Sequence, residues 1–110
     1  MKQNYHQLVY DITASIPEGR ASTYGAIADY LALGSARMVG WALNQLDFTD
    51  GDIPAHRVVN RKGELSGRNA FPTPDTMQKR LEAEGVEVKN DRIQNFDKVF
   101  WHPQELDKHL

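Results

Sequence analysis

The spacing of apolar residues predicts a helix near the start of the chain. Four of them fall at positions i, i+3, i+4 and i+7, the pattern of a helix with one buried face. These residues are Tyr5, Leu8, Val9 and Ile12. The predicted helix runs from about Gln3 to Ser15, and Pro17 and Gly19 end it because both residue types favour turns.

Two further apolar stripes predict a pair of short helices. Ser22 or Thr23 suits the N-cap of the first helix, Gly34 ends it, and Ser35 suits the N-cap of the second. The inward positions are Tyr24, Ile27, Ala28 and Leu31 in the first helix, and Val39, Ala42, Leu43 and Leu46 in the second. Two short helices joined by a tight glycine-containing turn predict a helix-turn-helix, whose second helix is the candidate for DNA recognition.

Two residues inside the recognition candidate each allow two interpretations. Gly40 lowers helix stability relative to alanine, which suits either the close approach of a ligand or tight packing between helices. Trp41 lies four residues after Arg37 on the same helical face. Its indole either extends the DNA-facing surface or packs against the core, and we favour packing.

The second half of the chain predicts a small β-hairpin and one more helix. Residues 57–59 suit a strand and Gly63 suits the turn of the hairpin. Thr73 followed by Pro74 suits a helix start, and Gly85 suits the position after its end. The inward positions of this helix are Met77, Leu81 and Val86.

The last residues predict an ordered tail. Residues 88–110 carry three large aromatic side chains, which a floppy segment does not normally hold. They are Phe96, Phe100 and Trp101. We expect residues 1–87 to form a mostly helical DNA-binding domain, and residues 88–110 to pack on the same domain as a C-terminal extension.

Composition limits the possible functions. The chain has 110 residues, of which 40% are hydrophobic and 25% charged, an ordinary globular mixture. An apolar run of about 18 residues, as a membrane helix needs, is absent. The first residues are too polar for a secretory signal, so we expect a cytoplasmic protein that does not bind membranes. We also expect a monomer.

The chain contains no cysteine. This excludes disulfides, thiolate nucleophiles and cysteine–zinc sites. The four histidines show no i, i+3 or i, i+4 pair that would suggest metal ligation on a helix. We therefore expect neither a metal nor a cofactor.

Charge gives a divided answer on nucleic acids. The net charge of −2 argues against a nucleic-acid binder, because such domains usually carry a basic excess. The segment from His56 to Arg68, however, contains four cations against one acid, Glu64. The acids Asp47, Asp50 and Asp52 stand in a separate loop. The basic segment can contact phosphates, or it is simply a solvated turn.

A motif in the middle of the chain resembles a known active site. Residues 53–58 read Ile-Pro-Ala-His-Arg-Val, similar to the Pro-Cys-His-Arg-Val motif of O6-alkylguanine-DNA alkyltransferases, with Ala55 in place of the alkyl-accepting cysteine. Four further blocks follow the order and approximate spacing of that family over about residues 1–86. They are Ile16-Pro17-x-Gly19 with Thr23-Tyr24-Gly25-x-Ile27-Ala28, then Ala36-Arg37-x-Val39-Gly40, then Gly63-x-Leu65-Ser66-Gly67, and finally Lys79 to Glu84-Gly85.

The resemblance implies a fold and a function. The cysteine-free version resembles the alkyltransferase-like proteins, which implies a winged helix-turn-helix-like domain that binds O6-alkylguanine in double-stranded DNA by nucleotide flipping, does not transfer the alkyl group, and flags the lesion for nucleotide excision repair proteins. The implied DNA-binding residues are Arg37, Tyr24, Thr23, Ser22, Ala36 and Arg68. The implied lesion pocket consists of Pro54, Ala55, His56, Arg57, Val58, Ser66, Gly67 and Glu84.

Individual roles follow from the matched positions. Arg37 stands at the position of the arginine that fills the gap left by the flipped base. The alternative is an ordinary surface arginine. Tyr24 is implied to press on a phosphate of the flipped nucleotide. The alternative is that it is a half-buried tyrosine of the core. Ser22 and Thr23 are candidates for phosphate contacts and for capping the helix, and the two roles are compatible. His56 and Glu84 would be the base and its orienting carboxylate, although Ala55 offers them nothing to activate. The small side chain of Ala55 leaves room for a bulky O6 substituent.

The sequence departs from the family at two places, and other functions remain open. Arg68 stands where the transferases usually have a tyrosine, and its role is a phosphate or pocket contact or a solvated loop. Leu46 lies about where many have an asparagine. A sequence-specific helix-turn-helix regulator would explain residues 23–46 but not the Pro-Ala-His-Arg segment. An enzyme with an unrecognised nucleophile is the third reading.

Overall fold

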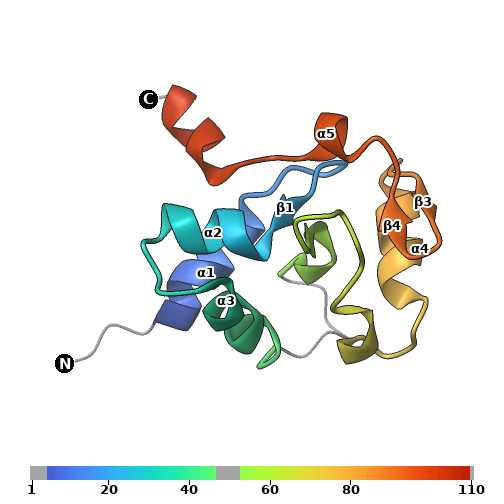
Figure 1. Ribbon diagram of the computed structural model, residues 1–110, viewed down its shortest axis with the longest axis horizontal. Coiled ribbons are helices and arrows are strands. Elements are labelled where there is room, and N and C mark those ends of the chain that lie inside the picture. Colours follow the sequence, from blue (N-terminus) through green and yellow to red (C-terminus); the bar gives the residue numbers. More distant parts are fainter. Residues whose placement is uncertain (1–4, 47–52, 110) are drawn as a thin grey trace.

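Helices dominate the computed structural model, which describes residues 5–46 and 53–109 (Figure 1). The first helix, α1, spans Tyr5–Ala14, close to the predicted range. It buries Val9 and Thr13, and the Thr13 hydroxyl satisfies itself by donating to the Val9 carbonyl at 2.7 Å. The loop that follows turns at Gly19, whose φ of +84° suits glycine.

The predicted helix-turn-helix is present. Helix α2 spans Tyr24–Tyr30 and α3 spans Ala36–Leu43. Thr23 caps α2 as predicted, because its hydroxyl accepts a hydrogen bond from the Ala26 amide at 3.0 Å. Helix α3 packs inward through Val39, Ala42 and Leu43, and the Tyr10 hydroxyl ties α1 to α3 by donating to the Ala42 carbonyl at 2.7 Å.

The predicted hairpin after Arg57 is misplaced. Strand β2, Val58–Val59, pairs in parallel with β1, Ser22–Thr23, from the other half of the chain. Both valines are fully buried, so this strand needs a partner inside the protein. The antiparallel hairpin instead joins β3, Val88–Lys89, to β4, Arg92–Ile93.

The segment between β2 and the last helices is irregular. A short 3-10 helix, η1, spans Ala55–Arg57 directly before β2, and another, η2, spans Arg68–Ala70 after it. Helix α4 spans Thr76–Ala83, so the predicted start at Thr73-Pro74 is too early. The Thr73 hydroxyl bonds the Asp75 carboxylate at 2.6 Å and closes a turn before the helix begins. Gly85 ends α4 with a φ of +88°, as predicted.

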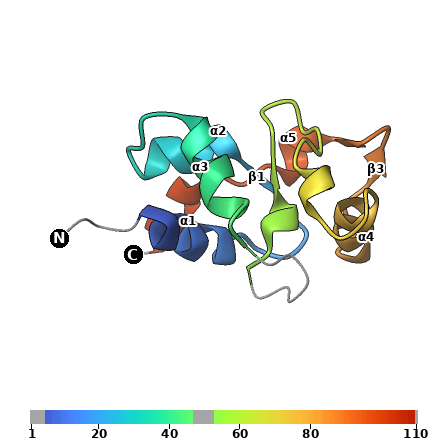
Figure 2. The same ribbon diagram turned by 90° about the horizontal axis from the view of Figure 1, so that it is seen from below.

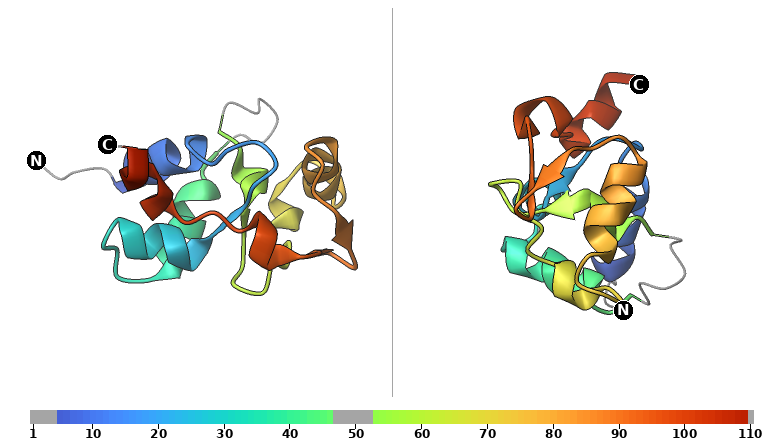
Figure 3. Two further views of the ribbon diagram at one scale, coloured as in Figure 1. Left: turned by 90° about the horizontal axis from the view of Figure 1, so that it is seen from above. Right: turned by 90° about the vertical axis from the view of Figure 1, so that its right-hand side faces the viewer.

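The tail crosses back over the helix-turn-helix (Figures 1 and 3). It contains α5, Phe96–Val99, and a 3-10 helix, η3, Pro103–His109, which contacts α2. Two backbone hydrogen bonds join the tail to Ala21. The Ala21 amide donates to the Val99 carbonyl, and the Trp101 amide donates to the Ala21 carbonyl. Trp101 is buried, as expected of an ordered tail.

One apolar cluster connects these elements. It draws side chains from α1, α2, α3, β2, α4 and the tail, so the two halves of the chain share one core. Its fully buried members include Val9, Ile27, Val39, Val58, Leu65 and Met77. Within residues 5–46 and 53–109, no helix combines the length and apolar character needed to cross a membrane. The acidic cluster Asp47–Asp52 lies outside the described residues.

Candidate nucleic-acid interface

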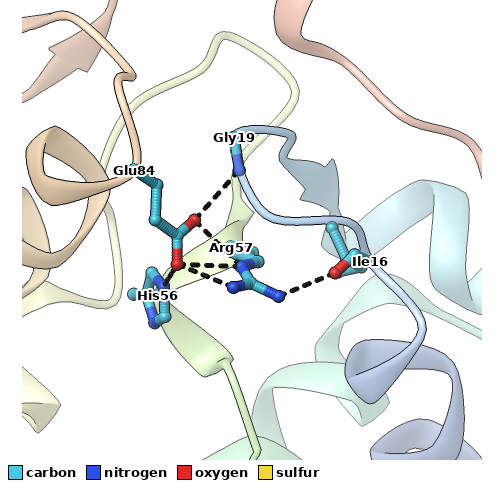
Figure 4. A network of polar contacts seen from close by, with 5 residues as sticks. All are labelled: Ile16, Gly19, His56, Arg57 and Glu84. Atoms are coloured by element: carbon cyan, nitrogen blue, oxygen red, sulfur yellow. Dashed lines mark hydrogen bonds and ion pairs between the residues drawn. The ribbon is translucent and has the colours of Figure 1, made fainter.

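Glu84 joins three distant parts of the chain in one polar network (Figure 4). It lies at the end of α4, and its carboxylate accepts from His56 Nε2 at 2.7 Å and from Arg57 Nη2 at 2.7 Å. The Gly19 amide donates to its other oxygen at 3.2 Å. Arg57 also reaches the Ile16 carbonyl at 2.8 Å. The contact between His56 and Glu84 that the resemblance implied is therefore present.

The network fixes the charge states of its members. Burial opposes ionisation of Glu84, but hydrogen bonds from Arg57, His56 and Gly19 outweigh it and lower its pKa to about 2. Burial also lowers the pKa of His56, against the attraction of Glu84. Because an ionised carboxylate only accepts, Nε2 of the neutral His56 carries the proton and Nδ1 keeps a lone pair.

Nothing at position 55 uses this lone pair. Ala55 begins η1 and is buried with 6% exposure, and its methyl group cannot act as a nucleophile. Pro54 before it is partly buried, and Val58 after the motif is fully buried. In the described residues, no group of three histidine or carboxylate side chains is arranged to hold a metal. The network thus holds the motif in a fixed conformation, but the motif has no nucleophilic atom at position 55.

The loop after β2 meets α2 at Tyr24. The Tyr24 side chain is half-buried, and its burial raises the pKa of the phenol against a hydrogen bond with Ser66. Gly67 lies so close that a Cβ added there would stand 2.7 Å from the Tyr24 hydroxyl. Tyr24, Ser66 and Gly67 therefore come together, which the sequence did not indicate because they are far apart in the chain.

Ser22 and Thr23 point inward. The Ser22 side chain is fully buried, and its hydroxyl has no hydrogen-bond partner among the described residues. Thr23 is also buried, and its hydroxyl is engaged in capping α2. A phosphate cannot reach the Ser22 hydroxyl, so the predicted contact is wrong for this conformation, and capping is the role that the geometry gives to Thr23.

Arg37 and Ala36 lie exposed at the start of α3. They border a groove of about 370 Å³ together with Tyr24, Gly40, Trp41 and Asn44. Among the described residues, Arg37 makes no hydrogen bond or ion pair. Among these residues, Arg37 is therefore not paired with a nearby acid, as an ordinary surface arginine would be.

Two expectations about α3 are corrected. Trp41 does not pack against the core, because its side chain is 54% exposed. Tight helix packing does not explain Gly40 either, since a Cβ there would meet no atom of another element within 4 Å. Both residues are on the groove side of α3, whose core-facing positions are already filled by Val39, Ala42 and Leu43.

The loop after β2, which carries the basic segment, lies next to the helix-turn-helix (Figure 2). Arg61 and Lys62, both exposed, border a second groove of about 330 Å³ with Asn60, and this groove shares Tyr24 and Ala36 with the first. Asn60 stiffens the turn, because its side chain accepts from the Lys62 and Glu64 amides at 2.9 Å.

Arg68 lies apart from the two grooves. Its guanidinium donates to the Leu65 carbonyl at 3.0 Å and stands 3.6 Å from the Asp91 carboxylate. The side chain is 36% exposed, so this pair is open to solvent and weak. The structure thus holds Arg68 at the edge of the loop that carries Ser66 and Gly67.

The comparisons with known proteins agree with this architecture. The family described as 6-O-methylguanine DNA methyltransferase, DNA binding domain, matches residues 4–86. Alkyltransferase-like protein 1 of Schizosaccharomyces pombe is 36% identical over 90% of this chain and 95% of its own length. A DNA base-flipping protein of Escherichia coli is 36% identical over 92% of this chain and 77% of its own. The chain belongs to the alkyltransferase-like branch of this family.

Solved structures of the family extend the match to three dimensions. The S. pombe protein Atl1, in complex with damaged DNA containing O6-carboxymethylguanine, has a TM-score of 0.82 at 35% identity, covering 94% of this chain and all of that one. The Mycobacterium tuberculosis transferase in complex with DNA has a TM-score of 0.63 at 33% identity, over 76% of this chain and 51% of that one. Unlike a transferase, this alkyltransferase-like chain has no cysteine to accept an alkyl group.

Proposed function

We propose that this chain binds O6-alkylguanine in duplex DNA by extruding the damaged nucleotide, and leaves the alkyl group in place. One observation carries the proposal: His56 and Arg57 of the motif both bond to the Glu84 carboxylate, while the buried Ala55 stands where the family resemblance puts the nucleophile. The similar S. pombe protein Atl1 forms a complex with damaged DNA containing O6-carboxymethylguanine, which supports the class of ligand.

The recognition helix provides the means of extrusion. Flipping a nucleotide costs a few kcal/mol, and a side chain has to fill the gap. Arg37 is exposed and unpaired among the described residues, and its planar guanidinium can stack and bond to the orphan base. Tyr24 borders both grooves beside it, where the phenol can press against a phosphate of the flipped nucleotide.

The pocket for the base lies between the motif and the loop after β2. Ser66 and Gly67 provide one wall through polar and backbone groups, with Arg68 at its edge. We place the other wall at Pro54 and Ala55, with the fully buried Val58 beneath them and His56, Arg57 and Glu84 holding the motif in place. The small Ala55 side chain leaves room for large O6 substituents.

The decisive experiment compares matched duplexes. Binding is measured to two DNA duplexes that differ only by an O6-methyl group on one guanine, at physiological salt, and we expect tighter binding to the alkylated one. A further duplex with a bulkier O6 group should bind at least as well. Equal affinity for plain and methylated DNA would remove the proposal, and a preference among undamaged sequences would indicate a regulator.

The absence of transfer is tested separately. The protein is incubated with the methylated duplex, and both are weighed by mass spectrometry. We expect unchanged masses, because the chain has no thiol. A gain of one methyl group on the protein, or restored guanine, would show that another residue accepts the group.

We further propose that the complex is a landmark for nucleotide excision repair. A complex that cannot react persists, and the family resemblance supports damage-recognition proteins as its partners. The tail and the acidic residues 47–52 are the candidate contact surfaces. Deleting the protein in cells with intact or disabled excision repair, under alkylation, tests this. Equal protection without excision repair would favour simple shielding of the lesion.

A further inference from the structure

Trp41 is the one large hydrophobic side chain that is exposed among the described residues. The second tryptophan of the chain, Trp101, is 3% exposed and belongs to the core. Single exposed apolar residues are common on protein surfaces, so exposure alone assigns nothing. The position of Trp41 gives its exposure a meaning.

Trp41 stands one helical turn after Arg37 on α3. Residues four apart lie on the same face of a helix, and the two side chains border the same groove of about 370 Å³. The groove is also open at Gly40, which lines it, because a Cβ there would meet no atom of another element within 4 Å. The indole and the Arg37 guanidinium therefore border the same open groove.

The charge around the two grooves selects the ligand. Their described lining residues include three cations, Arg37, Arg61 and Lys62, and no acid. This complements a phosphate backbone rather than a cationic partner. Apolar side chains beside such cations can wedge against base steps from the minor groove, and an indole can also pack on a deoxyribose.

We propose that Trp41 is a second DNA contact of α3, which packs against the undamaged nucleotides that flank the one displaced by Arg37. This inference rests on the proposed function for the placement of the duplex. Because flanking nucleotides are the same in plain and alkylated DNA, Trp41 adds affinity for both duplexes and contributes little to the discrimination between them.

The test measures the affinity of Trp41→Ala for the plain and the O6-methylguanine duplexes. We expect both affinities to fall by about tenfold, the scale of one lost stacking contact, with their ratio unchanged. Trp41→Phe should keep part of the affinity, because a phenyl ring still packs. Since Trp41 is exposed, both variants should melt at the wild-type temperature, and Gln45→Ala, also exposed just beyond α3, is the matched control.

Tryptophan fluorescence gives an independent readout. Wild-type protein should change its emission and become protected from acrylamide when either duplex is added, whereas Trp41→Phe, which retains only the buried Trp101, should not. Wild-type affinity of Trp41→Ala with no protection by DNA would overturn the inference. A loss confined to the alkylated duplex would also overturn it, because it would place Trp41 at the lesion.

The same data separate this inference from the proposed function. If the wild-type protein prefers alkylated DNA but Trp41→Ala binds normally, the function stands and the contact fails. If the wild-type protein shows no preference, yet Trp41→Ala weakens binding to both duplexes, the contact stands and the lesion specificity fails.

Discussion

The network around Glu84 and the groove side of α3 differ in the burial and bonding of their side chains. In the network, the side chains of Glu84, His56 and Arg57 are only 11–15% exposed and bond to each other. On α3, Arg37 has no partner among the described residues and Trp41 is 54% exposed. A buried charge without a partner is costly, whereas an exposed one can be kept free for a ligand.

This difference separates two functions that are combined in a transferase. The network would orient and activate a nucleophile, but here Ala55 leaves it only the task of joining α4, η1 and the loop at Gly19. The α3 face keeps what a DNA-binding surface needs. We therefore expect changes in the network to lower stability, and changes on α3 to lower binding.

The largest effect is expected for Glu84→Gln. The variant leaves Arg57 buried without an anionic partner, and breaking such a pair costs about 3 kcal/mol or more. The free energy of unfolding, measured by urea denaturation, should fall accordingly. Glu82→Gln, on the exposed side of the same helix, is the control and should change it by less than about 0.5 kcal/mol. Similar values for the two variants would mean that the network does not hold the fold.

Acid should weaken the same network. The pKa of Glu84 is about 2 in the folded protein, against an ordinary value of 4.5, so its contribution is complete above 4.5 and is lost as the pH falls toward 2. His56, with a folded pKa below 6.5, acts in the same direction, because the unfolded chain takes up its proton first. Melting temperature should therefore fall below about pH 6.5, and below about pH 4.5 it should fall less steeply in Glu84→Gln, which lacks the titrating carboxylate. Parallel curves for the two proteins would assign the acid sensitivity to other groups.

Arg37→Ala should weaken binding without affecting the fold. The side chain is exposed and unpaired among the described residues, so stability should stay within about 0.5 kcal/mol. Affinity for the alkylated duplex should fall by about 1–3 kcal/mol, as for a specific nucleic-acid contact, and more than for the plain duplex. Unchanged lesion binding by the folded variant would make Arg37 an ordinary surface residue.

The sequence predicted well what depends on local order. The helix spacing of α1 and the helix-turn-helix, the Thr23 cap and the glycine at the end of α4 follow from short-range rules and are present. The motif match brought His56 and Glu84 together, although 28 positions separate them in the chain. Local pattern alone could not have placed that contact.

Pairing and exposure were harder to predict. Val58–Val59 suits a strand, but no local signal shows that its partner is Ser22–Thr23, so the hairpin was put in the wrong place. Packing against the core was favoured for Trp41, whereas its side chain is exposed. Its exposure becomes evident only once Val39, Ala42 and Leu43 have filled the inner side of α3.

The smallest effect is expected for the basic turn. Arg61 and Lys62 border the groove next to Arg37 but make no ion pair among the described residues, so each is free to neutralise one phosphate. Replacing both with alanine should lower the slope of log affinity against log salt by about 0.9 per lost phosphate contact.

The basic turn should differ from Arg37 in its effect on discrimination, because the phosphates it contacts are the same in plain and alkylated DNA. The double variant should lose affinity for plain and alkylated duplexes by the same factor, leaving their ratio intact. Lys79 on α4 and Lys89 on β3 are exposed and border neither groove, so they give a control with the same change in net charge. If their replacement lowers the salt slope equally, overall charge and not the turn governs the approach to DNA. If the double variant changes the ratio between the duplexes, the turn reaches the lesion itself.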